Sequence, residues 1–260
     1  MNLQLRDKVV LISGGAKGIG AATVRALSEE SAIPVIVDRD AEAGEKLRDE
    51  LIRSGNRCFL IVADLASAES CAGSVKQAVQ EYGQLDVLIN NAGINDRVGL
   101  EHGNPEQYVE SLQRNLLHYY NLAHYALPLL KRSVGSIVNI ASKTAVTGQG
   151  GTSGYASSKG AILALTREWA VELLPYGIRI NAVVPAEVMT PLYRQWLSTF
   201  PDPEEKLKSI VSKIPLGKRM TTPEDIASMV AFLISPKAGH ITGQHLFVDG
   251  GYVHLDRALP

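Results

Sequence analysis

Tyr155 and Lys159 are the residues whose types and spacing most directly suggest chemistry in this sequence. They stand four positions apart in a stretch with helical apolar periodicity, so both side chains are expected on one face of a helix. An ammonium beside a phenol stabilises the phenolate and lowers the tyrosine pKa from ~10 towards neutral pH. The pair is a candidate proton-transfer unit, although the same spacing is also common on solvated helix surfaces.

A glycine-rich turn containing Gly14, Gly18 and Gly20 follows the first apolar run of the chain. Its GxxxGxG spacing differs from the common GxGxxG dinucleotide fingerprint but meets the same need. A pyrophosphate must closely approach the N–H groups at a helix N-terminus, and side chains would obstruct it. Lys17 and Ile19 belong to the same turn. A tight turn without a ligand is the alternative if these glycines are taken alone.

Asp38 ends the second apolar run, where a carboxylate can accept hydrogen bonds from the adenosine ribose hydroxyls and repel a 2′-phosphate. This favours NAD as the cofactor. NADP stays open, because Lys17 and Arg39 are cations that can accommodate such a phosphate. The alternative for Asp38 is a turn or helix-capping acid.

The elements that must position these residues follow from alternating short apolar runs and longer amphipathic stretches. Because the runs are apolar at nearly every residue, we expect parallel strands covered by helices on both faces, a doubly wound Rossmann-type α/β sheet. No linker or repeat divides residues 1–260, so we predict a single domain, with a helical flap at about 190–215 over the site. The predicted strands are Lys8 to Ser13, Pro34 to Val37, Cys58 to Val62, Asp86 to Asn90, Ser136 to Ile140, Arg179 to Val184 and His245 to Val248.

Composition excludes several other classes. Hydrophobic residues make up 45% of the chain, which allows a sizeable core, and 26 Lys and Arg against 27 Asp and Glu give a net charge of −1. No bulk attraction to nucleic acid or an anionic membrane surface is therefore expected. The apolar runs are too short to span a bilayer, which favours a cytoplasmic location. Two cysteines and six histidines without metal-ligand spacing predict no structural metal.

Several motifs together resemble the short-chain dehydrogenase/reductase family, over essentially the whole chain. They are the GxxxGxG turn, Asn90 to Gly93, Asn115, Ser142 and the Tyr155/Lys159 pair, in the family's order and separations. The resemblance implies that Tyr155 is the general acid/base and that Ser142 hydrogen-bonds the reacting oxygen. Lys159 then holds the nicotinamide ribose and tunes Tyr155, while Asn115 supports a water-linked proton relay.

The same resemblance extends the cofactor site along the carboxyl edge of the sheet. Ala186 stands where the family usually has glycine, a departure that bears on the backbone path to the nicotinamide. The further residues implied to contact the cofactor are Asp64, Leu65, Asn91, Ala92, Gly93, Pro185, Val188 and Thr190.

The residues expected to face the substrate are mostly polar and include an aromatic plane. Such a set suits a polyol, because its hydrogen-bonding groups would be left unpaired by a substrate without hydroxyls. Sugars are therefore the leading substrate class, with Glu187 as the leading contact. Besides Ser142 and Tyr155, these residues are Asn95, Asp96, Arg97, Lys143, Thr144, Gln149, Thr152, Glu187, Met189, Arg194 and Trp196.

A closer resemblance links 185–193, 200–203, 215–217 and 248–257 to the bacterial L-fucose dehydrogenase branch of the family. It implies oxidation of the C1 hydroxyl of a pyranose, most simply L-fucose, to the aldonolactone, and a homotetramer with the tail 252–260 near subunit contacts. Two alternatives remain open: a carbonyl reductase of 3-oxoacyl thioesters or another alcohol/ketone pair, and an NAD(P)-binding sensor subunit without turnover.

Overall fold

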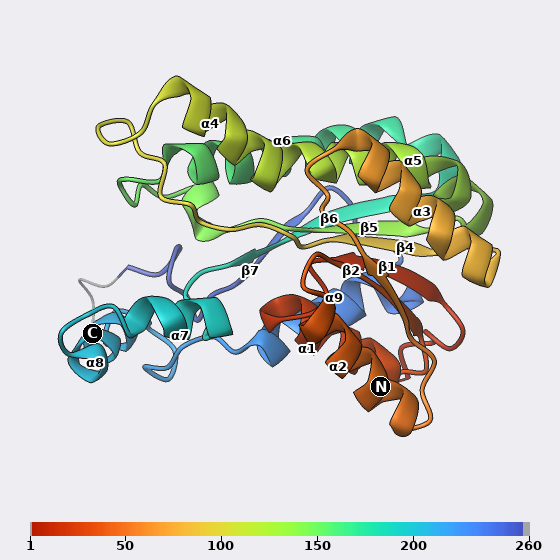
Figure 1. Ribbon diagram of the computed structural model, residues 1–260, viewed down its shortest axis with the longest axis horizontal. Coiled ribbons are helices and arrows are strands. Elements are labelled where there is room, and N and C mark those ends of the chain that lie inside the picture. Colours follow the sequence, from red (N-terminus) through yellow and green to blue (C-terminus); the bar gives the residue numbers. More distant parts are fainter. Residues whose placement is uncertain (1, 257–260) are drawn as a thin grey trace.

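Seven short runs rich in Val, Ile and Leu pair as one parallel sheet in the computed structural model, which describes residues 2–256 (Figure 1). The strand order is β3-β2-β1-β4-β5-β6-β7, so the predicted doubly wound sheet is confirmed. The order reverses between β1 and β4, and ligands of such sheets bind at the carboxyl ends of the strands beside this reversal. The strands are β1 (Val9–Ser13), β2 (Ile33–Asp38), β3 (Phe59–Val62), β4 (Val87–Asn90), β5 (Ser136–Ile140), β6 (Arg179–Pro185) and β7 (His245–Val248).

Both faces of the sheet are buried, which explains why its strands are apolar at nearly every position. Successive side chains of a strand point to opposite faces. On β1, Val9 and Leu11 pack into one core cluster, whereas Val10 and Ile12 pack into the other. A strand buried on both faces cannot alternate apolar with polar residues.

Helices form a layer on each side of the sheet (Figure 1). Helices α3 to α6 lie on one side, and α1, α2 and α9 on the other. No helix in residues 2–256 has the length and apolar character needed to cross a bilayer, and the cytoplasmic location stays a prediction. The helices are α1 (Gly18–Glu29), α2 (Ala41–Arg53), α3 (Ala68–Tyr82), α4 (Pro105–Leu112), α5 (His118–Ser133), α6 (Ser153–Glu172), α7 (Pro191–Leu197), α8 (Pro203–Val211) and α9 (Pro223–Ile234), with single 3₁₀ turns at Lys143–Ala145, Leu174–Tyr176 and Pro236–Ala238.

The segment after β6 contains two short helices, α7 and α8, where the sequence predicts a helical flap. They lie at the end of the molecule where β6 and β7 finish (Figure 1). The following helix, α9, begins with a capping box formed by Thr222 and Asp225, with Pro223 at the first helical position. Of the predicted C-terminal tail, residues 257–260 lie outside the described residues.

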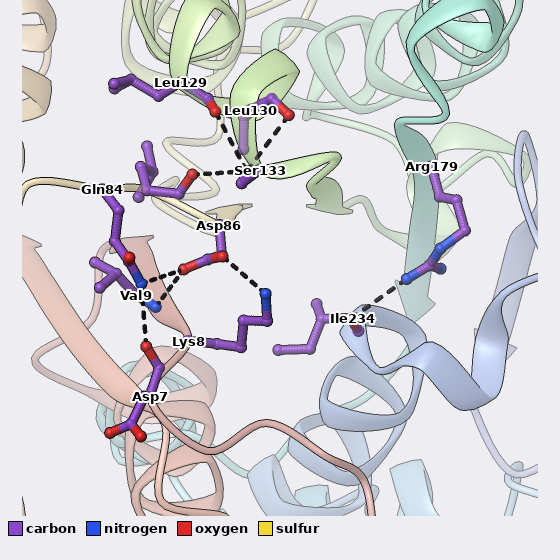
Figure 2. A network of polar contacts seen from close by, with 11 residues as sticks. Asp7, Lys8, Val9, Gln84, Asp86, Leu129, Leu130, Ser133, Arg179 and Ile234 are labelled. Atoms are coloured by element: carbon purple, nitrogen blue, oxygen red, sulfur yellow. Dashed lines mark hydrogen bonds and ion pairs between the residues drawn. The ribbon is translucent and has the colours of Figure 1, made fainter.

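The amino edge of the sheet is tied together by a polar network (Figure 2). Asp86, just before β4, accepts hydrogen bonds from Lys8 Nζ and Val9 N at 2.9 Å and from Gln84 Nε2 at 3.0 Å. The Arg179 guanidinium, at the start of β6, donates to backbone carbonyls at the end of α9, including Leu233 O at 2.7 Å. A cation at a helix C-terminus is favourably placed, so this edge is stabilised by groups that the chain itself satisfies.

Candidate active site

Four predicted catalytic residues meet near the carboxyl ends of β4 and β5. Ser142 follows β5, Tyr155 and Lys159 lie on α6, and Asn115 lies in the π-helical turn Gln113–Leu117 between α4 and α5. Gly93 stands between two of them, because a Cβ added there would lie 3.0 Å from Asn115 Oδ1 and 3.5 Å from Lys159 Nζ. The fold therefore brings together residues from four segments that are distant in sequence.

The Ser142 hydroxyl lies near the Tyr155 phenol and favours its ionised form. Burial raises the pKa of Tyr155, and Ser142 lowers it by less, so the pKa lies above its ordinary value. Ser142 Oγ is oriented by Thr144, whose Oγ1 donates to it at 3.1 Å. Nearby positive charge is therefore needed before this phenol can act as a base near neutral pH.

Lys159 is almost fully buried, with only 2% of its surface exposed. Its ammonium donates to Ile140 O at 2.8 Å and to the Tyr119 hydroxyl at 2.9 Å, and lies 5.6 Å from the centroid of the Tyr155 ring. Burial lowers the pKa of Lys159 to about 7. The predicted shared face of Tyr155 and Lys159 is thus confirmed, and the lysine charge is sensitive to small changes in its surroundings.

Asn115 is buried where the regular α-helical hydrogen bonding is interrupted. Its Oδ1 accepts from Ile94 N at 2.7 Å and its Nδ2 donates to Ser111 O at 3.1 Å. The side chain thus pins the chain after β4 to the helix pair. Single π turns are frequent at functional sites, since they offer backbone groups that a regular helix would use internally.

The glycine-rich turn fits a dinucleotide pyrophosphate. A Cβ on Gly20 would lie 2.0 Å from Gly14 O, so no side chain can be accommodated there. Helix α1 starts behind the turn without a side-chain cap from Lys17 and without acids in its first turn. The N-terminal N–H groups and the positive helix end are therefore left for an anion. Asn91 braces the turn by donating from Nδ2 to Ser13 O at 3.0 Å and Gly14 O at 2.9 Å.

Asp38 ends β2 beside this turn. Its two carboxylate oxygens accept from Ala16 N and Asp40 N, each at 3.0 Å, which fixes the carboxylate against the turn. Lys17 forms an ion pair with Asp40, the N-cap of α2, and Arg39 is exposed. Lys17 and Arg39 are the two cations that could accommodate the 2′-phosphate of NADP. The charge of Lys17 is therefore already neutralised by Asp40.

The other predicted cofactor residues lie along the carboxyl edge of the sheet and differ in their exposure. Thr190 contacts the turn, since a Cβ on Gly18 would lie 3.2 Å from Thr190 Cγ2, and Val188 is buried beside it. Ala186 has no positive φ, so the alanine is accommodated without the backbone freedom of glycine. Leu65 is buried in a core cluster and Asp64 is exposed, and the rest lie along the same edge: Ile19, Ala92, Gly93 and Pro185.

Two predicted substrate residues, Lys143 and Glu187, form a partly buried ion pair. The second oxygen of Glu187 accepts from the Tyr193 hydroxyl on α7 at 2.7 Å, and Lys143 Nζ lies 4.2 Å from the centroid of the Tyr252 ring. Burial and the adjacent Glu187 carboxylate raise the pKa of Tyr193, which keeps it a hydrogen-bond donor. One charged pair thus joins the residue next to Ser142 to α7.

The remaining substrate candidates are not all gathered at this pair. Trp196 packs edge-on against Tyr193, with ring centroids 5.0 Å apart, and Met189 is half-buried. Gln149 and Arg194 are exposed. Asp96 Oδ1 accepts from Ser111 Oγ at 2.9 Å. The others lie in the segments that follow β4 and β5, Thr144 within the 3₁₀ turn: Asn95, Arg97, Thr144 and Thr152.

The sequence did not predict four residues that contact the site. Tyr119 accepts a hydrogen bond from Lys159, Asp40 pairs with Lys17, and Tyr193 and Tyr252 contact the Lys143–Glu187 pair. Tyr119 lies four residues after Asn115, so helical spacing was an available signal for it. No local pattern predicts the others, because each contact joins separate elements.

Three features define a nucleotide-dependent oxidoreductase class: a doubly wound sheet, a glycine turn leading into an uncapped helix at the strand-order reversal, and a Ser/Tyr/Lys cluster. Comparison with known proteins agrees. The family model described as Enoyl-(Acyl carrier protein) reductase matches residues 14–253. The chain belongs to the short-chain dehydrogenase/reductase family, whose members use NAD(P) cofactors.

Individual relatives cover nearly the whole chain. L-fucose dehydrogenase from Oryctolagus cuniculus is 36% identical over 94% of this chain and 84% of that protein. The 3-oxoacyl-[acyl-carrier-protein] reductase FabG from Thermotoga maritima is 34% identical over 96% of this chain and 100% of that protein. The crystal structure of Cj0485 dehydrogenase has a TM-score of 0.94, with 45% identity over 100% of this chain and 99% of that one. These similarities establish an oxidoreductase acting on CH–OH groups.

Proposed function

We propose that this protein is an NAD-dependent dehydrogenase that oxidises the C1 hydroxyl of a pyranose aldose, L-fucose, to the aldonolactone. The observation that carries the proposal is the partly buried Tyr155 ring, whose centroid lies 5.6 Å from the Lys159 ammonium, together with Ser142 and the adjoining Lys143–Glu187 pair. Support for the substrate comes from similarity to L-fucose dehydrogenase and to a structure named aldohexose dehydrogenase, from Thermoplasma acidophilum, with 32% identity over 97% of this chain and 96% of that chain and a TM-score of 0.88.

The cofactor would be held by the glycine turn and the N-terminus of α1, with Asp38 directed to the adenosine ribose. Asp38 favours NAD, because its carboxylate repels a 2′-phosphate while Asp40 neutralises Lys17. A nicotinamide held there would supply the acceptor for the hydride of C1 and a positive charge that favours ionisation of Tyr155.

Proton transfer is assigned to Tyr155. Its phenolate takes the proton of the C1 hydroxyl, whose oxygen also accepts a hydrogen bond from Ser142. Loss of that proton and of the hydride converts the hemiacetal into the lactone. Lys159 stabilises the phenolate electrostatically. Asn115 holds the chain after β4 in place, because its Oδ1 accepts a hydrogen bond from Ile94 N at 2.7 Å.

A sugar is the substrate class that the surroundings support best. Lys143 and Glu187 offer a donor and an acceptor side by side, which matches vicinal hydroxyls. Met189 and Trp196 are apolar surfaces suited to the 6-methyl group of a deoxysugar. Comparable turnover of L-fucose and its 6-hydroxylated counterpart L-galactose would contradict this last assignment.

The test is a substrate panel measured as kcat/KM for oxidation, with NAD and NADP in parallel. L-Fucose, D-arabinose, L-galactose and a 3-hydroxyacyl thioester make up the panel. The proposal expects L-fucose with NAD to give the highest value. Turnover of the thioester with all sugars inert would instead establish the reductase activity named for the Thermotoga relative. Cofactor binding without turnover of any alcohol would favour a sensor.

We also propose a homotetramer. An apolar groove formed by the π-helical turn, α5 and α6, and lined by Leu116, Leu117, Tyr120, Ala161 and Leu165, supports association through this face. Light scattering coupled to size-exclusion chromatography measures the mass directly. A monomeric mass at micromolar concentration would exclude the assembly.

A further inference from the structure

Tyr119 on α5 is completely buried and completes a triangle of short polar contacts with Lys159. Lys159 Nζ donates to the Tyr119 hydroxyl at 2.9 Å and to Ile140 O at 2.8 Å, and the Tyr119 hydroxyl donates to the same Ile140 O at 2.9 Å. Because the phenol proton is directed at Ile140 O, the phenol oxygen presents lone pairs to the ammonium. The third ammonium hydrogen is not used by these two bonds and remains available on the side that faces Tyr155.

The Lys159 charge depends on these two neutral oxygens. No carboxylate in residues 2–256 forms an ion pair with Lys159. An ammonium taken out of water without a counter-ion loses much of its stability unless nearby acceptors replace the lost hydration. Each acceptor removed therefore shifts Lys159 towards its neutral form.

The other charged and titratable groups around this triangle act differently. Tyr155 faces Lys159 from the same helix, and His118 on α5 is close enough to feel the Lys159 charge. Burial, with help from the Lys159 charge, lowers the pKa of His118 to about 4, so the imidazole stays neutral in the alkaline range. Burial holds the pKa of Tyr119 well above its ordinary value. Tyr119 stays a neutral phenol there, and Ile140 O cannot take up a proton.

We propose that Tyr119 is a positioning residue that orients the Lys159 side chain and supports its charged form during catalysis. The inference rests on the proposed function, since it concerns how Lys159 serves Tyr155. Tyr119 passes no proton onward, because its hydrogen bond ends on a backbone carbonyl. Its effect is to extend the pH range over which Lys159 keeps the proton that stabilises the Tyr155 phenolate.

The test compares Tyr119→Phe with the wild type in the pH dependence of kcat for alcohol oxidation, using the panel alcohol with the highest turnover at saturating cofactor. Phenylalanine keeps the ring and removes the acceptor. We expect the alkaline limb, where Lys159 loses its proton, to move to lower pH by about one unit, which is about a tenfold loss of rate on that limb. Tyr125→Phe is the matched control: this tyrosine of the same helix is 38% exposed, and the profile of the variant should not move.

Thermal unfolding at each pH shows that the variant is folded where its rate is measured. Should Tyr119→Phe be too unstable, replacing Tyr119 by a fluorinated tyrosine keeps the hydroxyl but makes it a poorer acceptor, and predicts a smaller shift in the same direction. A uniform loss of kcat with unshifted limbs would mean a merely structural role and would overturn the inference.

Tyr155→Phe in the same assay distinguishes failure of the proposed function from failure of the role assigned to Tyr119. Activity retained in Tyr155→Phe contradicts the proposed function itself. An inactive Tyr155→Phe together with a wild-type profile in Tyr119→Phe leaves the proposed function standing and overturns only the role of Tyr119.

Discussion

Asp86 at the amino edge and Lys159 at the carboxyl edge are buried charges with opposite surroundings. Asp86 accepts three hydrogen bonds, one of them from the Lys8 ammonium, so this charge has its counter-ion within the chain. At the carboxyl edge, burial pushes the pKa of Lys159 down to about 7 and that of Tyr155 up, and Lys159 is held by neutral oxygens alone. The amino edge contributes stability, whereas the carboxyl edge gives up stability for groups poised to exchange protons.

The largest expected effect is at the carboxyl edge. Tyr155→Phe should lower kcat by roughly a thousandfold, because positioned acid/base catalysis contributes about 10²–10⁴-fold. Cofactor affinity, measured by calorimetric titration, should stay near wild type. Tyr176→Phe removes a hydroxyl from a half-exposed tyrosine away from the site and serves as the control. A similar loss in both variants would contradict the division between the two edges.

The second effect is at the amino edge. Asp86→Ala should lower the free energy of unfolding by about 3 kcal/mol, because it leaves Val9 N and Gln84 without their acceptor and Lys8 without its partner. Urea denaturation measures the change, and kcat of the folded variant should remain near wild type. For comparison, Asp49→Ala, which removes an exposed ion pair with Arg48, should cost about 0–1 kcal/mol.

A third, intermediate effect concerns the cofactor. Asp38→Ser should lower kcat/KM for NAD by about 10–100-fold, since hydrogen bonds donated to a charged carboxylate are worth about 1.5–3 kcal/mol. The value for NADP should rise, because the repulsion is removed. Asp49→Ser, which removes an exposed acid on α2, is the control and should leave both values unchanged. An unchanged NAD to NADP ratio in Asp38→Ser would contradict the assignment of Asp38.

The smallest effect tests the cost of the carboxyl edge. Lys159→Met should be inactive but more stable than the wild type by about 1–3 kcal/mol near pH 6.5, since a buried unpaired ammonium is replaced by an apolar chain. Folding lowers the pKa of Lys159 from 10.5 to about 7, so the penalty is complete below pH 7 and disappears as the pH rises to 10.5. The stability gain should therefore shrink across that range.

Denaturation curves at several pH values measure this gain. Lys76→Met replaces an exposed lysine on α3 and should show no such pH dependence. A Lys159→Met variant less stable than the wild type at pH 6.5 would mean that the ammonium is well supported where it lies.

Local pattern was enough for most of the architecture. The seven apolar runs predicted the strands to within one residue at each end, because burial on both faces leaves a continuous apolar signature. Tyr155 and Lys159 share a face by helical spacing alone, and the Thr222 to Asp225 sequence specifies its own capping box. In each case the interacting groups are close along the chain, so residue type and spacing determine the geometry.

Contacts between distant segments were decided only by the tertiary structure. The sequence predicted Lys143 and Glu187 as separate substrate contacts, whereas the fold pairs them with each other and with α7. Likewise, Lys17 meets Asp40, and Tyr119 reaches Lys159 across two helices. These partners depend on how helices pack against the sheet edge, since side-chain charges find counterparts in space and not along the sequence. The sequence determined which chemical groups are present and on which element each lies. Packing decided which of them remain charged, buried and available for chemistry.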